Sequence, residues 1–140
     1  MECSNTSNLT EIARVGEKLC EVMDFNNKLI AAINTSIEGI ALLDENGIYL
    51  WMNKAHERMF GYDEGELIGK SWTELYRDTD IEQFIECVFP IVEMTGSWHG
   101  EATAISKDGK TKVKEVLTLT ALPDGGLICT CRNKYNSDDL

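Results

Sequence analysis

A regular stripe of apolar residues marks the first part of the chain. Between residues 8 and 34 the apolar positions recur at spacings of three, four and seven, and Gly16 is the only Gly or Pro in this segment. Such spacings place side chains on one face of an α-helix. The pattern therefore predicts an amphipathic helix, whose heptad stripe consists of Leu9, Ile12, Leu19, Met23, Asn26, Ile30 and Ile33.

Two interpretations of this stripe stay open at this point. Either the helix covers the chain's own sheet, or two copies of the helix pair as a short coiled coil or bundle. In the second case Asn26, the polar member of the stripe, fixes the register of the pair. The segment only just reaches the length of about three heptads that a coiled coil needs.

The period of the pattern changes after residue 38. Residues 39–44 and 48–52 are short runs rich in apolar, β-branched and aromatic side chains, which is typical of strands. The connection between them ends in Asn46-Gly47, a pair that favours the positive φ angles of a tight hairpin turn. We expect two antiparallel strands here.

Short helices are predicted in the middle of the chain. Asn53 has the side chain of an N-cap before residues 54–60, and Asp63 has the same role before residues 64–68. Glu66 stands at the third position after Asp63 and completes a capping box.

The longest helical pattern of the second half spans residues 81–94, after a short turn that Ser71 is expected to cap. Apolar side chains gather on one face of this pattern and acidic side chains on the other. Pro90 lacks the amide hydrogen that a helix interior needs, so we expect the helix to kink or restart near Phe89.

Three further strands are predicted over residues 97–106, 112–122 and 127–133. An Asp-Gly pair lies in each of the two junctions between them. Because these pairs favour compact hairpin turns, the three strands should form an antiparallel meander.

This order of elements, together with several short phrases, resembles the PAS family. The phrases are Ser36-Ile37-Glu38-Gly39-Ile40, Leu43-Asp44-x-x-Gly47, Met52-Asn53-x-Ala55, Phe60-Gly61-Tyr62-x-x-x-Glu66-Leu67-Ile68-Gly69-Lys70, Gly96-x-Trp98-x-Gly100-Glu101 and Lys107-Asp108-Gly109. The resemblance covers about residues 33–133. The last strand departs from it, because many PAS domains end in Asp-Ile-Thr where this chain has Arg132-Asn133-Lys134.

The resemblance implies an α+β PAS fold, a five-stranded antiparallel sheet with short helices on one face, here preceded by the amphipathic helix. The chain then divides into a dimerisation helix over residues 1–34, a sensor domain over 35–134, and an acidic tail or linker start over 135–140. The family's cleft would be lined by Leu42, Met52, Phe60, Trp72, Phe84, Phe89, Trp98, Thr103 and Leu117. These side chains suit a ligand cavity and a solid core equally well.

The amino-acid composition of the chain disfavours some classes of binding partner. With 140 residues, of which 43% are hydrophobic, the chain fits one domain. Its 24 acidic and 13 basic residues give a net charge of −11, which disfavours nucleic acid and direct contact with anionic membranes. An odd number of cysteines without framework spacing, and no run of about 18 apolar residues, favour a cytoplasmic location.

The resemblance also allows the chain to be compared with relatives that bind flavin or haem. Light-sensing relatives carry a reactive cysteine where this chain has Trp72, so a flavin adduct cannot form there. Haem-binding relatives use a histidine of the long helix, and residues 81–94 contain none. Flavin and haem are therefore disfavoured, although aromatic side chains could stack on a non-covalent flavin. No cofactor is predicted, and a small-molecule ligand fits the family.

Few residues point to other chemistry. Cys129 and Cys131 share one face of a strand, but with a distant His99 they make a weak zinc set, so we predict no metal site. Glu101 and Glu115 lie on adjacent strands, and either could be an inward carboxyl with a raised pKa. The sequence shows no nucleophile with a base partner and no phosphate-binding loop, so no catalytic residue is predicted.

The resulting hypothesis is a non-catalytic sensor or dimerisation domain of a signal-transduction protein. It would form a homodimer and regulate an effector such as a histidine kinase or a response regulator, through a small ligand or a conformational signal. Two alternatives remain: a ligand-free dimerisation module, and a redox sensor that carries flavin or haem.

Overall fold

The computed structural model describes the backbone of residues 2–134 and the side chains of residues 8–134. The chain divides into two compact units, Met1–Thr35 and Ser36–Leu140. The tail predicted over 135–140 lies outside the described residues. Within the described part, no helix combines the length and the apolar character that crossing a membrane requires.

The first unit is a single helix, α1 (Glu2–Asn34), as the periodicity predicts. Its stripe side chains are exposed from Leu9 (67%) to Ile30 (41%), whereas Ile33 is half-buried. A second row of exposed apolar side chains runs beside the stripe and consists of Val15, Val22, Phe25 and Leu29. The apolar face is therefore wider than the predicted heptad stripe.

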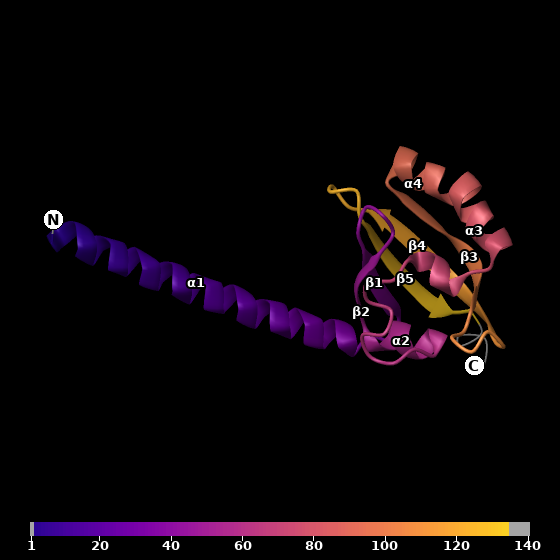
Figure 1. Cartoon of the computed structure of the whole chain (residues 1–140), viewed down its shortest axis with the longest axis horizontal. Coiled ribbons are helices and arrows are strands. Elements are labelled where there is room, and N and C mark those ends of the chain that lie inside the picture. Colours follow the sequence, from indigo (N-terminus) through magenta and orange to yellow (C-terminus); the bar gives the residue numbers. More distant parts are fainter. Residues whose placement is uncertain (1, 135–140) are drawn as a thin grey trace. The chain divides into compact units, whose positions relative to one another are not determined.

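The second unit is built on five strands, β1 (Gly39–Leu43), β2 (Tyr49–Met52), β3 (Ser97–Ile105), β4 (Lys112–Ala121) and β5 (Leu127–Asn133). They form one sheet in the order β2-β1-β5-β4-β3, in which all neighbours are antiparallel. This confirms the predicted sheet and its meander β3-β4-β5. Helices α3 and α4 cover one face of this sheet (Figure 1).

The turn between β1 and β2 differs in detail from the predicted one. Only Gly47 has a positive φ, of 76°, and no described residue other than glycine has one. The Asp44 side chain accepts hydrogen bonds from the amides of Asn46 (2.8 Å) and Ile48 (2.9 Å). The turn is thus held by a side-chain oxygen and one left-handed glycine, without the strained asparagine that the Asn-Gly pair suggested.

Helix α2 (Lys54–Phe60) begins at the predicted cap, Asn53. The Asn53 Oδ1 accepts hydrogen bonds from the amides of His56 (3.1 Å) and Ile40 (2.9 Å), and Nδ2 donates to the carbonyl of Glu38 (2.9 Å). Asn53 is completely buried. One side chain therefore caps the helix and also ties its start to the first strand of the sheet.

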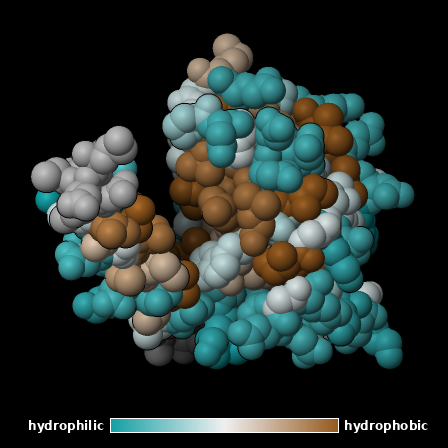
Figure 2. Space-filling model, turned by 60° about the vertical axis from the view of Figure 1, so that its left-hand side comes forward, coloured by the Kyte–Doolittle hydropathy of each residue, from teal (hydrophilic) through white to brown (hydrophobic). Residues whose placement is uncertain are grey.

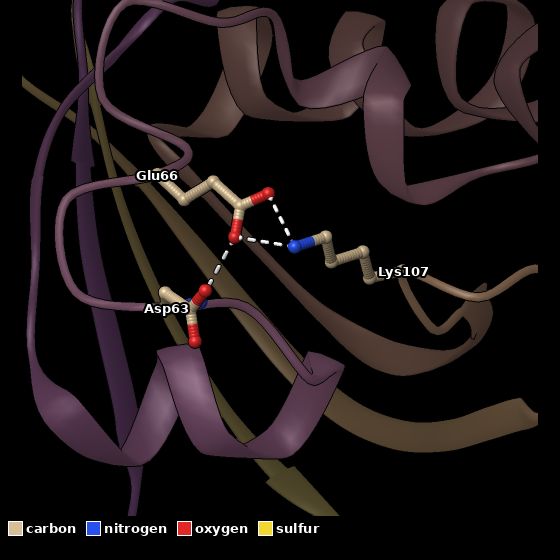
Figure 3. Close-up of polar contacts among 3 residues, drawn as sticks. All are labelled: Asp63, Glu66 and Lys107. Carbon is tan, nitrogen blue, oxygen red and sulfur yellow. Dashed lines mark hydrogen bonds and ion pairs between the residues drawn. The ribbon is translucent and has the colours of Figure 1, made fainter.

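The helix predicted over residues 64–68 is wrong, because the structure has consecutive turns there. Gly65 and Gly69 have φ angles of 74° and 85°, and a left-handed residue interrupts the α-helical ladder. Glu66 nevertheless accepts from the Asp63 amide (3.0 Å), so the back-bond of the capping box forms without its helix. Figure 3 shows that Glu66 also pairs with Lys107, whose Nζ lies 2.7 Å from Oε2.

The helical cover is made of short pieces. A 3₁₀ turn, η1 (Trp72–Leu75), follows Ser71 as predicted, and then come α3 (Asp78–Gln83), the π-helical turn η2 (Phe84–Val88) and α4 (Phe89–Thr95). The predicted restart near Phe89 agrees with the structure, in which the π-helical turn ends at Val88 and α4 begins at Phe89. The Phe89 amide donates to the Phe84 carbonyl five residues earlier, and this wide turn comes just before Pro90, which has no amide hydrogen to offer.

The core lies between the inner face of the sheet and this cover. Along β4 buried and less buried positions alternate, as expected for a strand with one covered face. The opposite face keeps apolar side chains that are only half-buried, among them Ile40, Leu42 and Val116. A continuous apolar area is visible on the side of this unit where β1 and β2 lie (Figure 2).

Replacing Asn53 by alanine should destabilise the second unit by about 2–4 kcal/mol, since a cap and two further buried hydrogen bonds are lost together. Urea unfolding followed by circular dichroism would measure this change. Asn46→Ala, in the exposed β1–β2 turn, is the matched control and should change the free energy of unfolding by less than about 0.5 kcal/mol. Equal stabilities of the two variants would contradict the bridging role of Asn53.

Candidate functional site

A cavity of about 430 Å³ lies between the inner face of the sheet and the helical cover. Its lining comes from the β1–β2 and β4–β5 turns, from strands β1, β2, β4 and β5, and from η1, η2 and α4. The lining residues are Leu43, Asp44, Glu45, Asn46, Gly47, Tyr49, Trp72, Tyr76, Phe84, Phe89, Val92, Glu93, Leu117, Leu119, Ala121, Gly125, Gly126, Leu127 and Cys129.

Four aromatic rings from the cover form one wall of the cavity. The Trp72 ring centroid lies 5.1 Å from that of Phe89 and 5.5 Å from that of Phe84, both edge to face. Tyr76 lies 4.9 Å from Phe84. Edge-to-face contacts of this kind stabilise an aromatic cluster beyond its buried area, so the wall is held in place by its own packing.

The sheet supplies the opposite wall. Leu117 and Leu119 project from β4, and Cys129 from β5, because alternate residues of a strand share a face. Tyr49 of β2 is buried beside them. Burial, with smaller contributions from nearby acidic groups, raises the pKa of the Tyr49 phenol well above its ordinary value, so this hydroxyl stays neutral.

The charged part of the lining is acidic. Asp44, Glu45 and Asn46 come from the β1–β2 turn, and Glu93 comes from α4. Glu45 and Glu93 are exposed, whereas the aromatic wall is mostly covered. Among the described lining residues there is no lysine or arginine.

One buried carboxyl adjoins this cavity through Tyr76. The Tyr76 hydroxyl donates a hydrogen bond of 2.5 Å to Oε1 of Glu115, which is completely buried on β4. Glu115 Oε2 has no hydrogen-bond partner among the described residues. Burial raises the pKa of Glu115 to about 7, although the bond from Tyr76 acts in the opposite direction. Of the two strand glutamates, Glu115 is thus the inward one, and exposed Glu101 pairs with Lys134.

The histidines and the buried cysteines come from different elements: His56 from α2, His99 from β3, and the neighbouring Cys129 and Cys131 from β5. His56 is buried between the rings of Tyr49 and Phe60, and burial lowers its pKa to about 4. His99 is exposed and lies 2.7 Å from the Thr118 hydroxyl. Cys129 and Cys131 are buried free thiols. Within the described residues, no group of three or more such side chains has the arrangement of a metal site.

The structure brings together only some of the residues expected at the cleft. Trp72, Phe84, Phe89 and Leu117 line the cavity. Met52 and Phe60 belong to the buried core but not to the lining, and Leu42 points from the other face of β1. Trp98 and Thr103 line a smaller cavity of about 160 Å³, to which Phe84 also contributes.

Sequence reasoning missed several lining residues. Leu119 could have been found, since it lies two residues after Leu117 on the same predicted strand. Cys129 shares a strand face with Cys131 in the sequence pattern, but nothing in that pattern links it to the cleft. Tyr76 follows a short turn and carries no periodic signal, so only the three-dimensional structure places it beside Glu115.

Comparison with known proteins identifies proteins with a similar architecture. The family model described as "PAS domain" matches residues 37–133. The PAS domain of a protein from Colwellia psychrerythraea superposes with a TM-score of 0.70 at 23% identity, covering 78% of this chain and 96% of that one. A domain of a sensory box sensor histidine kinase/response regulator from Geobacter sulfurreducens gives 0.66 at 24% identity, covering 80% and 96%.

A longer curated protein matches the same region. It is the high affinity cAMP-specific and IBMX-insensitive 3',5'-cyclic phosphodiesterase 8A of Mus musculus, 26% identical over 102 residues. The match covers 73% of this chain but only 12% of that protein. The similarity therefore concerns one part of the phosphodiesterase and carries no statement about its activity.

The buried Glu115 predicts a specific pH dependence of stability. Its pKa is raised from 4.5 to about 7 in the folded protein, so the folded state holds a proton that the unfolded state releases, and stability falls as pH rises through this window. The stability of Glu115→Gln relative to wild type should increase by about 2–3 kcal/mol between about pH 5 and about pH 8.5. Urea unfolding of both proteins at the two pH values measures the difference.

Glu101→Gln is the control for this experiment, because Glu101 is exposed on the neighbouring strand. Its stability relative to wild type should change little over the same range. A constant difference between wild type and Glu115→Gln would show that Glu115 titrates as an ordinary carboxyl.

Proposed function

Because the chain belongs to the PAS domain family through residues 37–133, we propose that its second unit senses a small molecule bound in the cavity between the sheet and its cover. The family is generally sensory and non-catalytic, and we propose no catalytic role for this unit. Its output would pass to an attached or associated effector. The sensor works, in this proposal, by a change in the sheet and its cover when the cavity is filled.

The observation that carries this proposal is the cavity itself. Its volume of about 430 Å³ falls in the range of small-molecule sites, about 300–1,000 Å³, and its lining is mostly apolar with a few polar groups, as such sites require. A ligand-free dimerisation module would be expected to fill this space with side chains, as protein interiors normally do. The cavity favours the ligand-binding alternative.

The lining also bears on the kind of ligand. Trp72 stands in the cavity wall, at the position where light-sensing relatives have their cysteine, so we propose a ligand held without a covalent bond. The cover residues 78–95 contain no histidine to ligate haem iron. An organic molecule without metal is the proposal that these side chains support best.

We propose that α1 pairs two copies of the chain. With Ile12, Leu19, Asn26 and Ile33 as a positions, Val15, Val22 and Leu29 fall at d, while Met23 and Ile30 fall at e. An apolar face of this width suits a core-facing bundle helix better than the narrow seam of a two-stranded coil. Asn26, a polar residue at an a position, would set the register.

The proposed effector follows from the kind of protein in which a structurally similar domain occurs. One structural neighbour is a domain of a sensory box sensor histidine kinase/response regulator, and a histidine kinase or response regulator is accordingly the proposed effector here. The net charge of −11 supports a role without contact to nucleic acid or to anionic membranes.

Filling the cavity should abolish binding of a small apolar probe. N-phenyl-1-naphthylamine, a neutral dye that brightens in apolar sites, should bind the wild-type protein, and Leu119→Trp should weaken its binding by about tenfold or more because the indole occupies the space. Leu50→Trp adds the same side chain at an exposed position of β2 and is the control. Equal binding to all three proteins would place the dye elsewhere and overturn the proposal.

Two charges introduced on the α1 stripe should separate the proposed dimer. Ile12→Glu with Leu19→Glu places two carboxylates in the apolar face, and the dimer should weaken by about 100-fold or more, which sedimentation equilibrium measures. Glu17→Gln, on the polar face, should leave the association unchanged. A wild-type chain that stays monomeric at high concentration would contradict the pairing of α1.

A further inference from the structure

The charged residues around the cavity favour ligands of one charge over the other. Asp44, Glu45 and Glu93 contribute carboxylates to its lining, and the described lining residues include no lysine or arginine. The Asp44 Oδ1 is already engaged by two amides of its own turn. Glu45 and Glu93 are exposed and hold no ion pair within the described residues. A ligand anion would therefore meet two carboxylates and no counter-charge.

The wall behind these carboxylates is aromatic. Trp72, Tyr76, Phe84 and Phe89 all line the same space, and aromatic faces attract organic cations through the negative potential of their π-systems. The effect is largest for tryptophan, and it grows when water is excluded. Carboxylates at the rim and aromatic rings within are the two groups that recognise an ammonium ion with an apolar body.

Glu115 adds to this arrangement from behind the wall. Tyr76 donates its hydroxyl hydrogen to Glu115, which leaves its ring more electron-rich and polarises it toward the carboxyl. The second oxygen of Glu115 has no partner among the described residues, although the side chain is completely buried. Because Glu115 is not part of the lining, the Tyr76 hydroxyl hydrogen is used outside the cavity and is not available to a ligand anion.

We propose that the cavity binds an organic cation, an ammonium compound whose apolar or aromatic body packs against Trp72 and Phe89 while its charge is balanced by Glu45 and Glu93. This inference rests on the proposed ligand-sensing function and narrows it to one chemical class. It disfavours ligands with phosphate or carboxylate groups. The net charge of −11 would also raise the local concentration of cations near the protein.

Three isosteric probes test the sign of the charge. They are benzyltrimethylammonium, the neutral neopentylbenzene and the anion phenylmethanesulfonate, and binding to the full chain is measured by ligand-observed NMR titration. Benzyltrimethylammonium should bind about tenfold or more tightly than phenylmethanesulfonate. Its affinity should also fall as salt is added, because the rim carboxylates are exposed and are screened.

Matched variants locate the charge effect. The double variant Glu45→Gln/Glu93→Gln should lower the affinity for benzyltrimethylammonium about three- to tenfold and leave the affinity for neopentylbenzene unchanged. Glu86→Gln removes an exposed carboxylate outside the lining and should alter neither affinity. Because all three positions are on the surface, these variants are expected to fold.

The outcomes separate this inference from the function on which it rests. If neopentylbenzene binds while benzyltrimethylammonium binds no better than the sulfonate, the cavity is a ligand site but the cation proposal is wrong. If none of the three probes binds, both proposals are overturned. If Glu86→Gln lowered the affinity for benzyltrimethylammonium as much as the double variant does, the effect would come from the overall charge. That result would also overturn the proposed role of Glu45 and Glu93.

Discussion

The hydrogen bond between Tyr76 and Glu115 joins the two layers of the second unit. The cover consists of the short turn η1 and of the helical segment in which α3, η2 and α4 follow one another, and in proteins helices are stabilised mostly by tertiary packing. They hold their places by packing on one another and on the sheet. Tyr76 lies between η1 and α3, and its bond to the middle of β4 crosses from the cover to the strand. The cavity lies beside this bond, because Tyr76 is one of its lining residues.

Much of the fold follows from local patterns in the sequence. The five strands and α1 could be predicted because their side chains repeat with periods of two and 3.6, and Pro90 correctly indicated that the helix restarts near Phe89. Residues 64–68 were mispredicted because Asp63 and Glu66 satisfy a helix start, whereas Gly65 adopts a left-handed conformation that no pattern revealed. The capping residues favour the start of a helix, but Gly65 and Gly69 adopt left-handed conformations that form turns instead.

The candidate site was harder to predict, because its parts come together from distant segments. Trp72, Phe84 and Phe89 stood out as aromatic residues of the cover, and Leu117 followed from strand alternation. Tyr76 and Glu115 are 39 residues apart, and nothing in the sequence of either segment reveals the bond between them. The π-turn η2 widens the helix between Phe84 and Val88, so it also alters which side chains of the cover face the sheet.

The contact between Gly47 and Trp72 couples the rim of the cavity to its wall. A Cβ atom at position 47 would lie 2.5 Å from Cδ1 of the indole, and the Trp72 amide donates to the Gly47 carbonyl at 2.9 Å. The indole and the β1–β2 turn therefore cannot move independently. Since this turn leads directly into β2, the edge strand of the sheet, any displacement of the indole would also displace the border of the sheet.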